Sequence, residues 1–287
     1  MKEITEIRKA NIQQALMEYC ERFGGQNKAA RLMEGVSGAT VSQIVNGRWA
    51  DIADEMWRKV AAQTGCESEP WNAVKTNTYR DLTALLEDAQ ANSLWMAITG
   101  NAGTGKTYTC GQYARGHRDV YVVSCDPDWT KRDFFSAALR RMGKDAAGLN
   151  LTQMKVKMVN ALRMLETPIM ILDEADKLSD TVLNSFITLY NELQYDCSVI
   201  FLATEFLNKR MTAGVRYSKK GFNELWSRVG RRCVALKGVT AQDIVAICEA
   251  NGVEDPKEID RIIDSSESDL RRVQRRVHAV LKKGLRG

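Results

Sequence analysis

Apolar side chains along the first part of the chain recur at the spacing of helices. The pattern predicts a long helix over residues 5–23, shorter helices over residues 26–34 and 38–45, and a further helix over residues 52–62. We therefore expect residues 1–64 to form an all-α domain.

The two short helices are joined by Gly35-Val36-Ser37, and a glycine-containing turn between short helices is typical of a helix-turn-helix unit. Gly35-Val36-Ser37 and the following Thr40-Val41-Ser42 resemble the repressor-type DNA-binding domains, although the step from Ala30 to Gly35 is one residue longer than in that family. The resemblance implies that the major groove is faced by Ser37, Ala39, Thr40 and Gln43. A helical interaction domain without DNA contact is the alternative, because residues 1–75 hold ten basic and ten acidic residues and so carry no net charge.

Beyond residue 78 the pattern changes to short apolar runs separated by helical segments. Strands that alternate with helices indicate a mostly parallel sheet with helices on both faces, which makes this an α/β domain. The apolar runs predict strands over residues 94–99, 119–125, 168–176, 198–203 and 232–236. Helical patterns cover residues 78–91, 108–115, 131–142, 152–165 and 178–193, and residues 240–283 predict helices only.

These patterns predict four parts of the chain. A helix-turn-helix domain over residues 1–64 is followed by a linker over residues 65–77, which contains Pro70 and little apolar pattern. An α/β nucleotide-binding domain over residues 78–237 and a small helical lid over residues 238–287 complete the chain.

The first strand runs directly into Gly100-Asn101-Ala102-Gly103-Thr104-Gly105-Lys106-Thr107, which matches G-x-x-x-x-G-K-[ST] at every specified position. Glycines let the backbone wrap closely round phosphate oxygens, and the next helix adds its positive N-terminal end. Lys106 is expected to reach the β- and γ-phosphates and Thr107 to bind Mg²⁺. The residues expected to bind ATP are Gly100, Asn101, Ala102, Gly103, Thr104, Gly105, Lys106, Thr107 and Tyr108.

Two acids end the third predicted strand, 67 residues after Lys106. Four apolar residues place Asp173 and Glu174 at the carboxyl end of a central strand, where ligands of parallel sheets bind. Asp173 is expected to hold Mg²⁺ and Glu174 to orient and polarise the attacking water. The two motifs together predict an ATP-hydrolysing site.

Residues from about 80 to 287 resemble the AAA+ ATPase family, which has an additional strand between the two nucleotide motifs, here residues 120–125. The resemblance implies that Thr204, after the fourth strand, is a polar sensor that helps to place the water. Leu225-Trp226-Ser227-Arg228-Val229 resembles the family's finger motif, so Arg228 is expected to reach the γ-phosphate of a neighbouring subunit. Ser268-Asp269-Leu270-Arg271 resembles the second sensor, with Arg271 acting in cis. The neighbouring alternatives for these two arginines are Arg231, Arg232 and Arg272.

Composition excludes several other classes of protein. No stretch approaches the ~18 consecutive apolar residues of a membrane span, and the charged N-terminus does not have the apolar core of a signal peptide. The seven cysteines are scattered without C-x-x-C spacing, which indicates neither a zinc site nor a disulfide framework. We expect reduced cysteines and a cytoplasmic, nucleoid-associated location.

The net charge of +5 is concentrated in two segments. Residues 131–157 hold seven bases against two acids, and residues 209–237 hold nine bases against one acid. Such segments favour a polyanionic partner. The residues expected to contact the DNA backbone are Lys131, Arg132, Arg140, Arg141, Lys144, Lys155 and Lys157.

The order of the parts resembles the transposition target-selection ATPases of the phage Mu B and TnsC type, as does the Asp126-Pro127-Asp128-Trp129-Thr130 loop. This resemblance implies an ATP-bound homo-oligomer or helical filament on duplex DNA that recruits a transposase and disassembles on hydrolysis. Two alternatives stay open: a helicase loader of DNA replication, and a helix-turn-helix transcription regulator with an ATPase switch.

Overall fold

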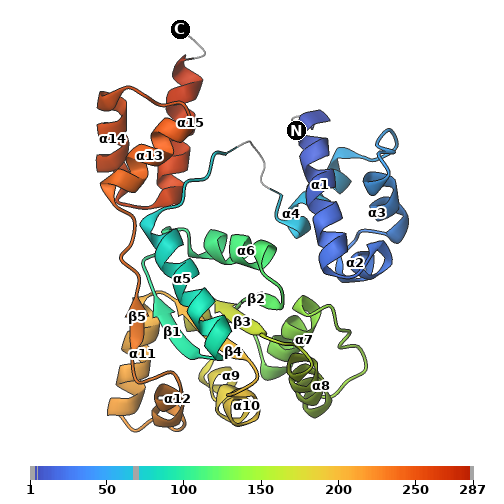
Figure 1. The fold of residues 1–287 in the computed structure, drawn as a ribbon, viewed down its shortest axis with the longest axis vertical. Helices are drawn as coiled ribbons and strands as arrows, with labels where there is room; N and C mark the ends of the chain where they lie inside the picture. The colour runs from blue at the N-terminus through green and yellow to red at the C-terminus, as the bar shows by residue number, and fades with distance from the viewer. Residues whose placement is uncertain (1–3, 5, 67–70, 285–287) are drawn as a thin grey trace. The chain divides into compact units, whose positions relative to one another are not determined.

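The computed structural model describes residue 4, residues 6–66 and residues 71–284. The chain divides near residue 71 into two compact units, each of which has its own hydrophobic core (Figure 1). None of the helices in these ranges is long and apolar enough to cross a membrane.

The first unit contains the four helices that the apolar pattern predicts. Ile12, Leu16 and Trp57 are completely buried in its core, together with Val41 and Ile44 of the third helix. The helices are α1 (Glu6–Arg22), α2 (Gln26–Leu32), α3 (Gly38–Val45) and α4 (Asp54–Thr64).

Local contacts define the turn between α2 and α3. Gly35 has a φ of 67°, a left-handed conformation that glycine adopts without steric cost. Ser37 then caps α3, because its Oγ accepts a hydrogen bond from the backbone N–H of Thr40 at 3.1 Å. At the other end of α3 the amide of Gln13 donates to the carbonyl oxygens of Ile44 and Val45. The turn therefore joins two helices with defined ends.

The second unit is an α/β domain followed by a helical lid. Its sheet strands are β1 (Trp95–Thr99), β2 (Val120–Ser124), β3 (Ile169–Asp173), β4 (Ser198–Ala203) and β5 (Cys233–Ala235). The helices of the α/β domain are α5 (Asn77–Asn92), α6 (Lys106–Gly116), α7 (Lys131–Arg141), α8 (Leu151–Arg163), the 3₁₀ turn η1 (Ala175–Lys177), α9 (Asp180–Leu183), α10 (Ser185–Leu193), α11 (Glu205–Arg216) and α12 (Phe222–Arg228). The lid consists of α13 (Ala241–Ala250), α14 (Pro256–Ser266) and α15 (Leu270–Gly284).

The five strands form one parallel sheet in the order β2-β3-β4-β1-β5, which confirms the predicted α/β fold class. In this order β4 lies between β1, which leads into the phosphate-binding loop, and β3, which ends in the acids. Because all strands run in the same direction, their carboxyl ends meet at one edge of the sheet.

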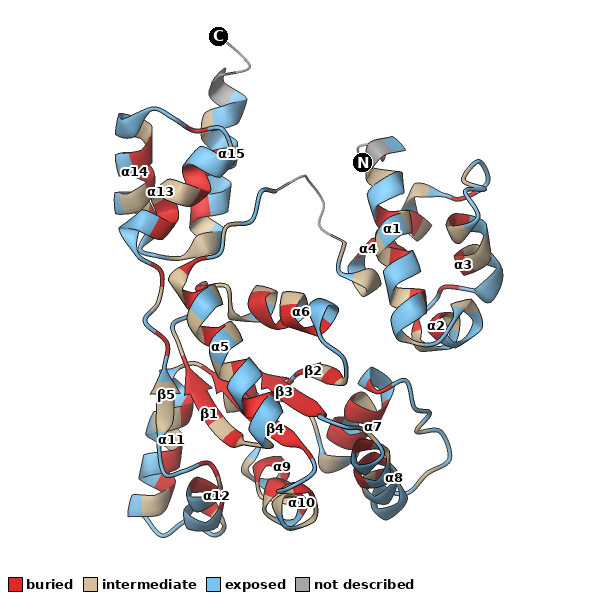
Figure 2. Cartoon of the chain, viewed as in Figure 1, coloured by how far each residue is buried: buried red, intermediate tan, exposed pale blue. Residues whose placement is uncertain are grey.

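Alternate side chains of each strand enter two different cores. Met170 and Leu172 of β3 pack with α7 to α12, whereas Ile169 and Ile171 pack with α5 and α6. The edge strands β2 and β5 are only partly buried. The three central strands β3, β4 and β1 are buried on both faces, as Figure 2 shows by their mostly red colour. This double burial explains why their sequences are continuous apolar runs.

The helix predicted over residues 178–193 differs from the structure. Ser179 caps α9 by accepting a hydrogen bond from the backbone N–H of Val182, so the helix begins at Asp180 and Leu178 is extended. A turn at Asn184 then separates α9 from α10. The helical spacing of apolar residues in this region is continuous, but the structure divides the region into two helices.

Helices α11 and α12 were not predicted from the sequence. The buried face of α11 is a narrow stripe that includes Leu207 and Met211 among many charged residues. Gly214 completes that stripe, and a Cβ there would lie 2.1 Å from the Phe222 ring of α12. The missing side chain allows the two helices to pack closely, but a glycine at this position weakens the helical pattern of the sequence.

A buried amide joins four elements of the α/β domain. The side chain of Gln90, in α5, donates to the carbonyl oxygens of Arg118 and Thr167 at 2.9 and 2.8 Å. It also accepts a hydrogen bond of 2.7 Å from the hydroxyl of Tyr113 in α6. Gln90 therefore connects two helices to the segments that enter β2 and β3.

We expect Gln90→Ala to lower the free energy of unfolding by about 3 kcal/mol, because it leaves two carbonyls and a hydroxyl buried without their partner. Urea denaturation of the full chain measures this loss. The control is Gln242→Ala, which removes the same side chain from an exposed position of α13. Equal losses in both variants would contradict the structural role of Gln90.

Candidate nucleotide-binding site

The loop between β1 and α6 forms the centre of the candidate site. Gly103 and Gly105 have φ values of 75° and 89°, which favour glycine and turn the backbone back on itself. The ammonium group of Lys106, at the start of α6, donates to the carbonyl oxygens of Gly100 and Asn101 at 2.7 Å each. Burial lowers the pKa of Lys106, whereas Asp173 and Asp176 oppose this effect. The loop therefore directs a cation and the N-terminus of α6 to the same place, as binding of a polyphosphate requires.

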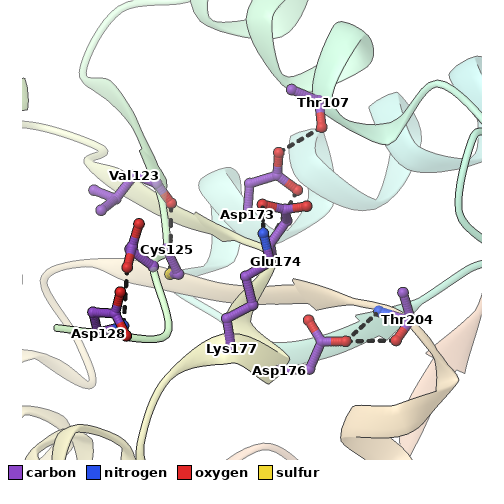
Figure 3. A network of polar contacts seen from close by, with 10 residues as sticks. Thr107, Val123, Cys125, Asp128, Asp173, Glu174, Asp176, Lys177 and Thr204 are labelled. Carbon is purple, nitrogen blue, oxygen red and sulfur yellow. Dashed lines mark hydrogen bonds and ion pairs between the residues drawn. The ribbon is translucent and has the colours of Figure 1, made fainter.

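Thr107 and Asp173 are brought together although they are 66 residues apart. The Thr107 hydroxyl donates to Oδ2 of Asp173 at 2.6 Å, at the carboxyl end of β3 (Figure 3). Burial raises the pKa of Asp173, and the hydrogen bond from Thr107 acts in the opposite direction. A hydroxyl and a carboxylate at this spacing are hard oxygen ligands of the kind that Mg²⁺ prefers, so the two residues fit that ion.

Glu174 follows Asp173 in a left-handed backbone conformation, with a φ of 58°. The bend separates its side chain from that of Asp173, and Glu174 is exposed whereas Asp173 is buried. Oε2 of Glu174 lies 2.7 Å from Nζ of Lys177, and this hydrogen bond raises the pKa of Lys177. Glu174 is thus an accessible carboxylate beside the buried one, with a cation as its partner.

Thr204 lies at the end of β4, next to the acids of β3. Its hydroxyl and its backbone N–H both donate to Oδ2 of Asp176, as Figure 3 shows. Arg210 of α11 donates to the backbone carbonyl of Asp176 at 3.1 Å and forms an ion pair with Asp180. We did not single out Asp176 or Arg210 from the sequence, although Asp176 belongs to the acidic end of the third apolar run.

Arg228 is held within the chain by contacts from α10 and α12. Its guanidinium donates to the Asn191 side chain at 3.2 Å and to the Glu224 carbonyl at 3.1 Å. It also lies 5.4 Å from the centre of the Tyr190 ring. No sequence pattern pointed to Asn191 and Tyr190, because they lie 37 and 38 residues before Arg228 and meet it only through the packing of α10 and α12.

The lid contacts the phosphate-binding loop through the first turn of α15. The backbone N–H of Leu270 donates to the carbonyl of Gly103 at 2.8 Å. A Cβ at Gly103 would lie 2.2 Å from Oδ1 of Asp269, so only glycine allows this approach. Arg271 follows directly, and its charge contributes to the lowered pKa of Lys106. The structure therefore brings Arg271 to the edge of the candidate nucleotide site.

The basic residues expected to contact DNA are distributed over two helices and the turn between them. Lys131, Arg132, Arg140 and Arg141 belong to α7, Lys144 to the turn, and Lys155 and Lys157 to α8. Lys155 lies 2.5 Å from Glu192, so its charge has a partner within the chain. In the first unit Ser37 and Gln43 are exposed and Thr40 is half-buried, but Ser37 and Thr40 also bond each other at the start of α3.

The chain was compared with protein families, with curated proteins and with solved structures. A model of the family described as AAA domain matches residues 89–211. The chain is 24% identical over 242 residues to the Mu-like prophage FluMu DNA transposition protein B of Haemophilus influenzae, covering 80% of this chain and 82% of that protein. It is 23% identical over 242 residues to the ATP-dependent target DNA activator B of Escherichia phage Mu, covering 81% and 75%.

Among solved structures, the crystal structure of Cdc6p from Pyrobaculum aerophilum matches with a TM-score of 0.53 and 16% identity, over 76% of this chain and 65% of that one. At this identity the match shows a shared fold. The resemblance to AAA+ ATPases of the Mu B type is confirmed by the family match and the two curated relatives, whereas the helix-turn-helix assignment stays a prediction.

Proposed function

We propose that this chain, an AAA+ protein similar to the Mu B type, is a Mg²⁺-dependent ATPase that assembles on duplex DNA and regulates DNA transposition. The observation that carries the proposal is a similarity over 242 residues to relatives named as a DNA transposition protein and an ATP-dependent target DNA activator. The hydrogen bond between Thr107 and Asp173 supports the ATPase part, since it joins the two nucleotide motifs in one site.

Hydrolysis is assigned to residues at the carboxyl edge of the sheet. Lys106 and the N-terminus of α6 bind the β- and γ-phosphates, while Thr107 and Asp173 would hold Mg²⁺. When bound, that ion neutralises charge that develops on the phosphate oxygens. Glu174 orients the attacking water and accepts its proton. Thr204, held by Asp176, positions the water from the β4 side.

Arg228 is assigned to the site of a neighbouring subunit, where its charge stabilises the transition state. Within its own chain the guanidinium contacts Asn191 and Tyr190. Arg271 contacts the nucleotide in cis from the lid. The catalytic site is then complete only between subunits, so ATP promotes assembly and assembly promotes hydrolysis.

Assembly on DNA uses the basic residues of α7 and α8, with the transposase as the partner that the assembly recruits. Contacts to phosphates carry little sequence information and weaken with salt. The first unit adds Ser37, Thr40 and Gln43 as groove contacts in this proposal. Because residues 1–75 carry no net charge, we expect this part of the chain to contribute little affinity by itself.

Electron microscopy of the full chain with duplex DNA and a slowly hydrolysed ATP analogue tests the proposal. We expect continuous protein-coated DNA that is absent without nucleotide and that disassembles with ATP. Footprinting should give continuous protection instead of one discrete site. A discrete protected site would favour the transcription regulator, and rings that load a helicase would favour the helicase loader.

A further inference from the structure

The last helix of the lid carries a strong charge that the nucleotide site does not use. α15 contains six basic residues and no acid, and it buries Val273 and Val277 completely. Arg275, Arg276 and Lys282 are exposed, and among the described residues none of the three has a carboxylate within ion-pair distance. These three residues are called the α15 basic face below.

Helix stability does not explain this arrangement. Like charges four residues apart, such as Arg271 with Arg275 and Arg272 with Arg276, repel each other on a helix. Cations in the first turn also meet the positive end of the helix dipole. If α15 were only a solvated helix, acidic residues at several of these positions would make it more stable. The concentration of basic residues therefore indicates an anionic ligand.

The charges of the lid are divided between its two last helices. Residues 254–269, which include α14, hold seven acids and two bases, whereas α15 holds bases alone. Arg272 of α15 forms an ion pair with Glu267, with 2.7 Å between the two charged groups. The acids of the preceding segment therefore do not neutralise the α15 basic face, and a polyanion is attracted to one side of the lid.

The same helix also contacts the nucleotide site. Leu270 donates to Gly103 of the phosphate-binding loop, and the Leu270 side chain approaches to 3.2 Å from the position of a Cβ on Gly105. Arg275 and Lys282 follow Arg271 by four and eleven residues and so share its side of the helix. An α-helix rises about 1.5 Å per residue, so this stripe extends roughly 16 Å from the nucleotide site.

We propose that the α15 basic face is a second contact with duplex DNA, made by Arg275, Arg276 and Lys282 with backbone phosphates. The contact is separate from the α7 and α8 residues and is joined through Leu270 to the loop that binds ATP. This inference rests on the proposed function, because it needs a chain that binds DNA.

The test compares full-length Arg275→Gln/Arg276→Gln/Lys282→Gln with the wild type. Binding to a random-sequence duplex is measured by fluorescence anisotropy at several salt concentrations with a slowly hydrolysed ATP analogue. We expect at least tenfold weaker binding, and the slope of log affinity against log salt should fall by about 2 to 3, since each lost phosphate contact removes about 0.9. Binding of the ATP analogue should stay within about twofold of the wild type, because Arg271 is unchanged.

The control Arg80→Gln/Arg118→Gln/Lys257→Gln removes the same charge from exposed positions elsewhere in this unit and should keep the wild-type slope. Arg275→Lys/Arg276→Lys keeps the charge and should restore most of the affinity. A wild-type slope in the triple variant would overturn the inference. The inference would also be overturned if the triple variant kept the wild-type salt slope of DNA binding but no longer assembled with ATP in the absence of DNA. The α15 basic face would then contact a second copy of this chain. If the wild type itself bound no duplex, the proposed function would fail.

Discussion

Glu174→Gln is expected to lower the ATP turnover rate by 10² to 10⁴, a typical range for loss of a group that accepts a proton in the transition state. The amide keeps the shape of the side chain but cannot take the proton of the attacking water. ATP binding should be retained, because Lys106, Thr107 and Asp173 are unchanged. Steady-state phosphate release and the equilibrium affinity for a fluorescent ATP analogue measure the two effects separately.

Glu166→Gln makes the same change at an exposed position before β3 and serves as the control. In the proposed function the Glu174→Gln protein also stays on DNA after ATP is added, since hydrolysis is the step that releases it. A variant that loses ATP binding together with turnover would contradict the assignment, because Glu174 would then hold the nucleotide and not the water.

Arg228→Ala should lower turnover by about 10³, the lower end of the range for loss of an arginine finger. The wild-type rate per subunit should rise with protein concentration, and this rise should disappear in the variant. A mixture with Lys106→Ala is the sharper test. In an assembly of the two variants, a Lys106→Ala subunit can supply its Arg228 to the intact phosphate-binding loop of an Arg228→Ala subunit. A mixture of the two inactive proteins should therefore hydrolyse ATP.

Arg231→Ala and Arg232→Ala are the matched variants, because both arginines are exposed and lie within four residues of Arg228. If one of them, and not Arg228→Ala, is inactive alone and restored by Lys106→Ala, that arginine is the finger. Asn191→Ala leaves the guanidinium without its side-chain partner and should cause a smaller loss than Arg228→Ala. A mixture that remains inactive would argue against any finger in trans.

The sequence was most informative for features that are formed by contiguous residues of one segment. The three central strands are buried on both faces and produce continuous apolar runs, and the partly buried edge strands β2 and β5 still contain short apolar runs, so all five were predicted. The phosphate-binding loop was predicted for the same reason, since its glycines, Lys106 and Thr107 are contiguous. The predicted third strand extended three residues too far, to residue 176, because the acids that follow Asp173 belong to the turn after the strand. Helix α11 was missed because its buried stripe depends on a partner helix, which a sequence pattern does not include.

The rest of the candidate site depends on contacts between distant segments. Asp176 meets Thr204 because β3 and β4 are adjacent in the sheet, and Arg228 meets Asn191 because α10 packs on α12. Asp269 reaches Gly103 only through the position of the lid. Such pairs are set by strand order and helix packing, whereas spacing along the chain gives no indication of them.

The division of charge within the lid has a kinetic consequence. Acids before Leu270 and bases after it give this small domain an electric dipole. The field of a polyanion exerts a torque on that dipole and turns the molecule before any contact forms. The lid should therefore arrive at a duplex with α15 leading and α14 turned away. Salt should accordingly slow association more than it speeds dissociation, so ionic strength would control how often the protein reaches DNA.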